Sequence, residues 1–125
     1  MFTYAGLARR KNWSRKPFQW SRVLTKCPQK RGKVQKVRIT SPRKPNSARR
    51  KTVKLKLVNL KTPVSYVPGG GHTLKRYSAV MVRGKGARDL PGVYSSCMRG
   101  KFDLAPVVTR KRRRSIYGVK VIDMD

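Results

Sequence analysis

Carboxylates are almost missing from this chain. Its 125 residues include 4 Asp and Glu against 33 Lys and Arg, which gives a formal net charge of +29. All four acids lie in the last third, at Asp89, Asp103, Asp123 and Asp125. Folded proteins of this size rarely carry such self-repulsion alone, so the counter-charge has to come from a partner. A polyphosphate backbone supplies it best, and the sequence therefore predicts a nucleic-acid-binding protein.

Histidine and cysteine are also scarce, which disfavours enzymes and metal sites. General acid–base catalysis uses positioned histidines or paired carboxylates, whereas this chain has 1 His and four scattered aspartates. Cys27, His72 and Cys97 offer three zinc ligands without a paired spacing, although a structural zinc site needs four. We expect no catalytic residue, no metal and no cofactor, and two reduced, separate thiols.

Long apolar runs are missing as well. No stretch approaches the roughly twenty apolar residues of a membrane span, and no signal-peptide core follows Met1. We therefore expect no membrane partner. The basic N-terminus has the composition of a transit peptide and equally that of an arm that penetrates RNA. Because Met1 is present, the arm is the favoured interpretation.

The first 31 residues show no sustained periodicity, and Pro17 and Pro28 interrupt any long helix. We expect an extended basic arm over residues 1–31, with one short helix near residues 3–10. The aromatic side chains of this arm could stack on bases, fill grooves in a partner or cap the domain's own core, and the sequence leaves these alternatives open. They are Trp13, Phe18 and Trp20.

From Gly32 onward, short β-like runs alternate with turn residues. The expected strands cover residues 33–40, 52–58, 64–67, 79–82 and 93–98. Five short strands with long polar loops fit an all-β, five-stranded OB-type Greek-key barrel, and an SH3-like barrel would fit the same pattern. We assign the barrel to residues 32–105 and a basic C-terminal tail to residues 106–125.

A glycine run at residues 69–71 raises the question of a phosphate-binding loop, because consecutive glycines let backbone N–H groups approach an anion. A nucleoside-triphosphate loop continues with Gly-Lys-Ser or Gly-Lys-Thr. Here the run leads into His72 and Thr73. The sequence therefore does not predict a nucleoside-triphosphate site.

The most specific polar pattern is the stretch from Thr40 to Lys51, which holds two prolines, an Asn-Ser pair and five cations. Prolines stiffen the backbone, while small polar groups are held between positive charges. Such a rigid cationic loop suits contact with phosphates. Asn46 and Ser47 are suited to reading ribose hydroxyls and base edges in an A-form minor groove, or alternatively to capping the turn.

A second basic loop covers residues 83–92 and carries Asp89 between Arg88 and Leu90. A carboxylate in so cationic a chain is expected to orient Arg88 or a loop lysine, or to accept hydrogen bonds at a partner surface. The alternative is a turn-forming aspartate beside Pro-Gly.

Five ordered motifs then match a known family over roughly residues 26–120. They are Cys27-Pro28-Gln29-Lys30-Arg31-Gly32, Pro42-Arg43-Lys44-Pro45-Asn46-Ser47-Ala48, Pro68-Gly69-Gly70-Gly71-His72-Thr73-Leu74, Asp89-Leu90-Pro91-Gly92-Val93 and Ser115-Ile116-Tyr117-Gly118. In this order they closely resemble the bacterial and organellar form of the S-twelve family of small-subunit ribosomal proteins.

The resemblance implies a non-enzymatic structural constituent that binds rRNA at the decoding centre and tunes the accuracy of tRNA selection. Its implied partners are small-subunit rRNA, neighbouring small-subunit ribosomal proteins, A-site tRNA and mRNA, and transiently bound elongation factors. The implied decoding-centre residues are Arg43, Lys44, Pro45, Asn46, Ser47, Arg88, Asp89, Leu90 and Pro91. The expected rRNA-binding residues are Lys30, Arg31, Arg49, Arg50, Lys51, Lys85, Arg110, Lys111, Arg112, Arg113 and Arg114.

Departures from the family pattern concern its cations. Arg43 and Arg88 stand where the family usually has lysine, and a guanidinium binds phosphate bidentately where an ammonium acts as a point charge. The divergent arm and the scarcity of acids favour a mitochondrial ribosome, with a plastid ribosome or the bacterial cytoplasm as alternatives. The alternative function is a free OB-type binder of single-stranded nucleic acid, or an RNA chaperone, with stacking platforms at Trp13, Trp20 and Tyr66.

Overall fold

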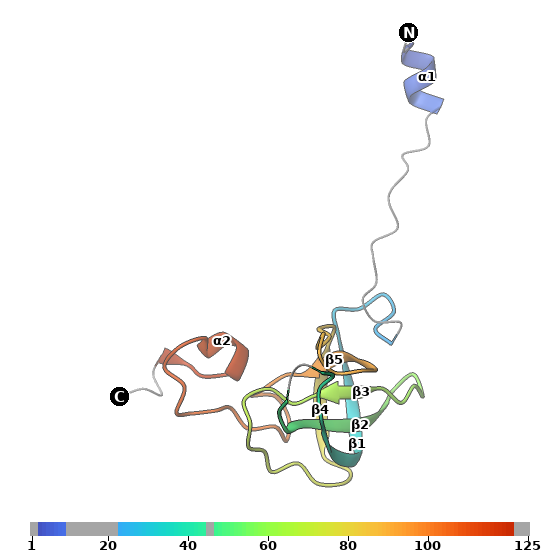
Figure 1. Cartoon of the computed structure of the whole chain (residues 1–125). Helices are drawn as coiled ribbons and strands as arrows, with labels where there is room; N and C mark the ends of the chain where they lie inside the picture. Colours follow the sequence, from blue (N-terminus) through green and yellow to red (C-terminus); the bar gives the residue numbers. More distant parts are fainter. Residues whose placement is uncertain (1–2, 10–22, 45–46, 122–125) are drawn as a thin grey trace.

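The structure is a computed structural model that describes residues 3–9, 23–44 and 47–121. Its elements are, in chain order, α1 (Tyr4–Arg9), β1 (Gln29–Thr40), β2 (Arg50–Leu57), β3 (Val64–Tyr66), β4 (Ala79–Arg83), β5 (Val93–Cys97) and α2 (Arg114–Tyr117), as Figure 1 shows. Trp13, Phe18, Trp20, Pro45 and Asn46 lie outside the described residues, so the predictions made for them stay predictions.

The five strands close into a barrel in the order β1-β2-β3-β5-β4. Every pairing is antiparallel except that of β3 with β5. The barrel closes through β1, whose first residues pair with β4 and whose later residues pair with β2. The predicted all-β, OB-type architecture is confirmed.

Gly32 lies where β1 changes its pairing from β4 to β2, and it pairs with both Val80 of β4 and Leu57 of β2. A Cβ at this position would lie 2.8 Å from Leu57 Cδ2 and 3.3 Å from the Lys56 carbonyl oxygen. The missing side chain therefore lets β2 cross β1 closely. A register shift between Val34 and Lys36 follows, as expected where a long strand bends around a small barrel.

Alternation along the strands builds the core as predicted. Val53, Leu55 and Leu57 of β2 are buried, and Val80 and Val82 of β4 face the same interior. The buried residues share a position inside the ring, and the most completely buried of the larger ones are Leu55, Leu104, Val34, Val53, Val67, Val80 and Val82. A lean core is therefore sufficient, since five short strands surround it on all sides.

Two strands begin earlier than predicted, and four strands end one residue away from the predicted end. The strand expected to begin at residue 33 begins at Gln29, and the strand expected at residue 52 begins at Arg50. Both extensions are polar and basic, so no apolar alternation marks them. They are strands because barrel closure gives their backbone groups a partner: residues 29–33 pair with β4, and Arg50 pairs with Thr40.

The short helix expected near residues 3–10 is present as α1, whereas α2 was not expected. It ends at Tyr117 and is capped by Gly118, whose φ of 69° lies in the left-handed region. The Gly118 N–H bonds to the carbonyl oxygens of Arg114 and Ser115. A Cβ on Gly118 would lie 2.8 Å from the Arg99 carbonyl oxygen. The segment after the barrel therefore approaches the backbone at Arg99 closely, and its Val119 is buried.

Both cysteines are free thiols, with Cys27 half-buried and Cys97 buried. Burial raises the pKa of Cys97 to about 12 although Arg99 acts in the opposite direction. Among the described residues, no group of His, Cys, Asp and Glu side chains is arranged to hold a metal ion. No helix in that part of the chain has the length and apolar character needed to cross a membrane.

Candidate nucleic-acid interface

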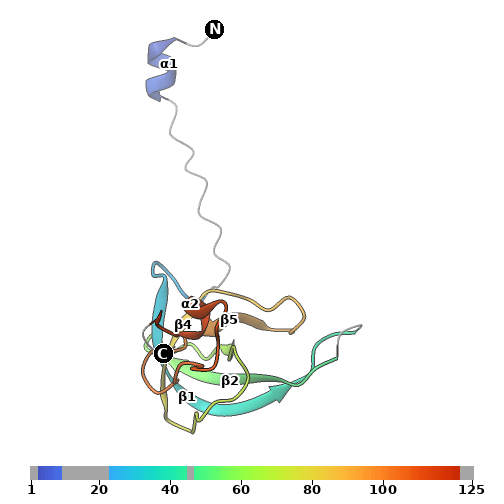
Figure 2. The same ribbon diagram turned by 90° about the vertical axis from the view of Figure 1, so that its left-hand side faces the viewer.

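The cationic loop between β1 and β2 starts from a closed hairpin base. Thr40 pairs with Arg50 in the ladder. The Thr40 hydroxyl lies 3.3 Å from the Thr52 hydroxyl and 3.4 Å from the Arg50 carbonyl oxygen. Figure 2 shows the chain leaving β1 and returning to β2 at one end of the barrel. The exposed residues of this loop are Ser41, Arg43, Lys44, Ser47, Ala48 and Arg49.

Asp89 joins this loop to the one at residues 83–92. Its carbonyl oxygen accepts a hydrogen bond of 2.9 Å from the Arg43 N–H. Its carboxylate forms an ion pair with Arg50, with 2.6 Å between Oδ2 and Nη2. Backbone and side chain of one residue thus hold both ends of the first loop. Charge-assisted contacts of this length are among the stronger polar interactions in proteins.

The ion-pair partner of Asp89 differs from the prediction, which named Arg88 or a loop lysine. Within the described residues the carboxylate contacts Arg50. The turn role left open by the sequence is also present, because the Leu90 N–H donates to the Ala87 carbonyl oxygen at 3.3 Å. Sequence reasoning missed the Arg50 contact because the two residues are distant in the chain, and only barrel closure brings them together.

Two hydrogen bonds attach the second loop, residues 83–92, to β5. The Ala87 N–H donates to the Val93 carbonyl oxygen at 3.2 Å, and the Ser96 hydroxyl donates to the Lys85 carbonyl oxygen at 2.9 Å. Leu90 is only 3% exposed. Within this chain Leu90 therefore anchors the loop and does not offer its side chain to the surface. Arg88 and Pro91 remain exposed beside it.

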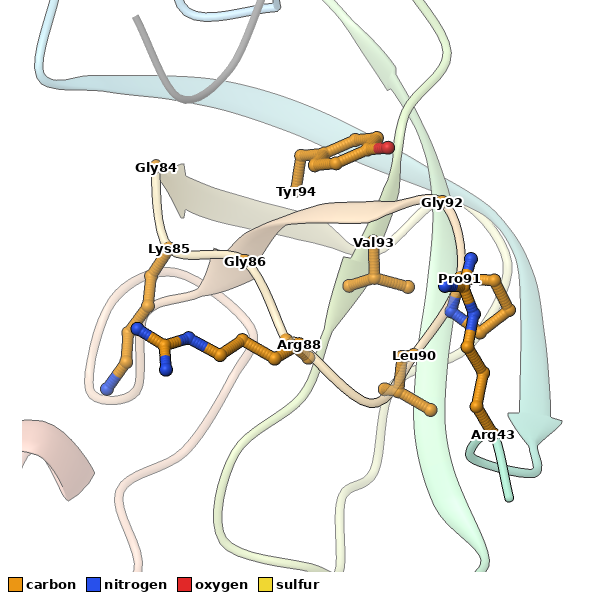
Figure 3. A pocket seen from close by; sticks show the side chains of 11 residues that line it. Arg43, Gly84, Lys85, Gly86, Arg88, Leu90, Pro91, Gly92, Val93 and Tyr94 are labelled. Carbon is orange, nitrogen blue, oxygen red and sulfur yellow. The ribbon is translucent and has the colours of Figure 1, made fainter. Parts of the chain in front are cut away.

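A cavity of about 590 Å³ lies along the second loop and the start of β5, and Arg43 of the first loop also lines it. Its floor includes Leu90 and Val93, and three cations line it, Arg43, Lys85 and Arg88. In Figure 3 the Arg88 side chain extends toward Lys85 at one end of the loop, while the Arg43 side chain lies beside Pro91 at the other end. We call residues 40–44, 47–51 and 83–92 the two-loop surface. Its charge and hollow shape suit an anionic, partly apolar partner such as RNA.

Comparison with known protein families shows which family this chain belongs to. The family described as Ribosomal protein S12/S23 matches residues 18–120. The chain belongs to the ribosomal protein S12/S23 family. A relative, the small ribosomal subunit protein uS12m of Paramecium tetraurelia, is 53% identical over 100 residues, which cover 80% of this chain and 72% of the relative. The predicted resemblance is confirmed, and the chain is a structural, non-enzymatic ribosomal protein.

The remaining cations predicted to bind rRNA include two on β1 and five in the segment that follows the barrel. Lys30 and Arg31 lie on the first part of β1, where they pair with Val82 and Met81 of β4. The Arg110 guanidinium lies 4.5 Å from the Tyr117 ring centroid. Exposed basic side chains continue from there to α2, at Lys111, Arg112 and Arg113. The structure therefore joins Arg43 and Arg50 through Asp89 and places Lys85 and Arg88 at the same cavity as Arg43. Lys30, Arg31 and residues 110–114 lie outside the two loops.

Arg99 is a structural residue of this family member that sequence reasoning missed. It is 8% exposed. Its guanidinium donates to three carbonyl oxygens, from Nε to Pro68 at 2.8 Å, from Nη2 to Gly71 at 2.7 Å and from Nη1 to Ala105 at 3.1 Å. We call this arrangement the carbonyl cluster. Burial lowers the pKa of Arg99 from its usual value, and the carbonyl dipoles offset part of that desolvation cost.

The carbonyl cluster also explains the glycine run. Carbonyl groups at Pro68 and Gly71 point at a guanidinium inside the protein, so this loop is organised around a cation and not around a bound anion. Next to it, burial and the charges of Lys51 and Arg99 lower the pKa of His72. His72 Nδ1 accepts a hydrogen bond of 3.2 Å from the Leu74 N–H, which requires the ring to be unprotonated at that atom.

Proposed function

We propose that this chain is a constituent of the small subunit of the mitochondrial ribosome that binds rRNA at the decoding centre and tunes the accuracy of tRNA selection. Membership of the S12/S23 family gives it a structural role in the ribosome. The name of the relative uS12m supports the small subunit and the mitochondrion. Its partners are small-subunit rRNA and neighbouring small-subunit proteins, with A-site tRNA, mRNA and transient elongation factors at the two-loop surface.

The observation that carries the decoding role is the double attachment of Asp89. The Arg43 N–H and the Arg50 guanidinium both bind this residue. Two loops that are distant in the sequence therefore form one preorganised surface. A preorganised surface loses less conformational entropy on binding than two independent loops would. Small differences in codon–anticodon geometry can then appear as differences in binding free energy.

Cations and uncharged groups have different roles on this surface. Exposed arginines and lysines neutralise rRNA phosphates, and the guanidinium groups of Arg43 and Arg88 can bind them bidentately. The exposed Ser47 hydroxyl carries no charge and can both donate to and accept from a ribose hydroxyl. Family resemblance assigns Pro45 and Asn46 to the same role. We infer that the cations anchor the loop and that Ser47 inspects the minor groove.

The experiment that tests this function replaces Ser47 by alanine in ribosomes that carry a misreading reporter. Loss of one hydrogen bond is expected to reduce discrimination between cognate and near-cognate tRNA by about 0.5–1.5 kcal/mol. Ser41→Ala is the matched control, because Ser41 is an exposed serine of the same loop. Equal misreading by wild type and Ser47→Ala would remove the hydroxyl from the decoding mechanism.

A wash of small subunits at high salt distinguishes an integral ribosomal protein from the alternative, a free binder of single-stranded nucleic acid. A free binder of single-stranded nucleic acid holds RNA mainly through salt-sensitive phosphate contacts, so it should leave small subunits as ionic strength rises. An integral constituent should cosediment with them. Release of the full chain under conditions that retain other small-subunit proteins would support the free binder.

A further inference from the structure

Two exposed aromatic residues occupy backbone conformations that aromatic residues rarely adopt. Tyr77 is 70% exposed with a φ of 70°, and Phe102 is 48% exposed with a φ of 51°. Positive φ is unfavourable for a bulky residue because its Cβ approaches the following carbonyl group. Burial in the core would offset this cost, but most of Tyr77 and about half of Phe102 are exposed. Such strain is typical of binding sites.

Each of these rings is covered by an arginine. The Arg31 guanidinium carbon lies 4.8 Å from the Phe102 ring centroid, and that of Arg76 lies 5.0 Å from the Tyr77 ring centroid. These are cation–π distances. A guanidinium held over a ring presents a second flat face outward, and flat cationic faces are surfaces on which nucleobases stack. We call Arg31, Arg76, Tyr77 and Phe102 the aromatic–arginine patch.

The turns that carry the two rings are held to each other. The Asp103 N–H donates to the Ala79 carbonyl oxygen at 3.1 Å, and the Ala79 N–H donates to the Asp103 carboxylate at 2.7 Å. The Tyr77 N–H donates to the Val34 carbonyl oxygen at 2.7 Å. The patch is therefore attached to the barrel wall at β1 and β4 and does not depend on the two-loop surface for its position.

The positive charge around the aromatic–arginine patch favours an RNA partner over a hydrophobic protein partner. The carboxylate of Asp103 already accepts the Ala79 N–H, and the other exposed charges on these turns and on the adjacent part of β1 are lysines, at Lys33, Lys75 and Lys101. A hydrophobic protein partner would bury these ammonium groups at a cost. A single-stranded RNA segment would instead neutralise them with phosphates while its bases stack.

We propose that the aromatic–arginine patch is a second rRNA contact, on which unpaired bases stack against Phe102 and Tyr77 and their covering guanidinium groups. The proposal rests on the rRNA binding of the proposed function and not on the decoding role. Its ligand is an unpaired nucleotide of single-stranded rRNA, because paired bases have no free face to offer an aromatic ring.

Zero-length ultraviolet crosslinking of small subunits that carry the full chain, followed by mass spectrometry of nucleotide adducts, tests the proposal. Adducts are expected on the peptides that contain Tyr77 and Phe102. In subunits carrying Tyr77→Ala or Phe102→Ala, chemical probing should show a several-fold gain in reactivity of the same nucleotides. Phe102→Tyr keeps a ring and should retain protection, whereas Val108→Ala removes another exposed apolar side chain and should change nothing.

Folding effects are separated by Tyr77→Gly and Phe102→Gly, because glycine adopts positive φ without strain. The free full-length variants should melt at the same temperature as wild type or higher, while base protection in the subunit is lost. Lower melting temperatures would show that the rings serve the fold, and would overturn the proposal.

The remaining outcomes are equally decisive. A photoreactive phenylalanine analogue at position 102 that captures a protein would overturn the proposal, as would the lack of any adduct at either ring. Adducts on the two-loop surface without adducts here would contradict this inference alone. Adducts at Tyr77 and Phe102, together with equal misreading by wild type and Ser47→Ala, would contradict the decoding role alone.

Discussion

The two-loop surface and the carbonyl cluster hold an arginine in opposite ways. Arg50 is held by the carboxylate of Asp89, at a position where both side chains remain partly exposed. Arg99 is buried and held by three backbone carbonyl groups. In a chain with four acids, neutral acceptors fix the interior cation, and the carboxylate is used where two cationic loops must be joined. The difference shows that this protein stabilises cations inside with dipoles and leaves most surface cations for its partner.

The comparison leads us to expect the largest effect from removing Arg99. Arg99→Met should destabilise the fold by about 2–4 kcal/mol, because the buried Pro68 carbonyl group and two partly exposed carbonyl groups lose their charged donor. Thermal unfolding of the full chain measures this loss. Arg113→Met, at an exposed position, is the matched control and should stay within roughly 0.5 kcal/mol of wild type. Equal stability of the two variants would show that the carbonyl cluster does not hold the fold.

The next largest expected effect is a difference in thiol reactivity between Cys27 and Cys97, the buried thiol whose pKa Arg99 influences. Because burial raises the pKa of Cys97 to about 12, the reactive thiolate is rare near neutral pH. Alkylation in the native protein should therefore proceed at half-buried Cys27 and be much slower at Cys97, since raising the pKa from 9.0 to about 12 lowers the thiolate fraction roughly 1000-fold. Quantitative mass spectrometry of the two alkylated peptides gives the ratio.

The same shift predicts how stability depends on pH. A thiol whose pKa is raised in the folded protein stabilises the fold while it stays protonated. This contribution is fully present below the unfolded value and is lost as the pH rises from about 9 to about 12. In Cys97→Ala this part of the alkaline decrease in stability should disappear. An identical alkaline profile for wild type and Cys97→Ala would contradict the assignment.

The smallest expected effect is that of separating the two loops. Asp89→Asn keeps the shape of the side chain and removes its charge, so the coupling to Arg50 should fall by about 0.5–1.5 kcal/mol after allowance for partial exposure. A double-mutant cycle with Arg50→Met measures this coupling. Arg49→Met, the exposed neighbour, serves as control. If the Asp89→Asn and Arg50→Met effects simply add, the ion pair does not join the loops.

Local pattern was a reliable guide wherever a residue's role depends on its neighbours in the chain. Alternation over β2 predicted Val53, Leu55 and Leu57 as buried residues, and they are buried. The same method missed the basic start of β1, since residues 29–33 form a strand only because β4 pairs with them. It also missed α2. The N-cap residue of this helix, Arg113, has a left-handed φ of 53° and makes no side-chain capping hydrogen bond, so the usual sequence signal for a helix start is missing.

The sequence by itself determined the class of partner, the barrel and the family, because net charge, alternation and ordered motifs are all readable along one chain. Tertiary structure alone decided which groups meet. Arg50 and Asp89 come from different loops, and Arg99 reaches carbonyl groups from two other segments. Tyr77 and Phe102 lie on turns that are hydrogen-bonded to each other through Ala79 and Asp103. The physical reason is that each contact depends on closing the barrel, and no local pattern encodes the partner that closure supplies.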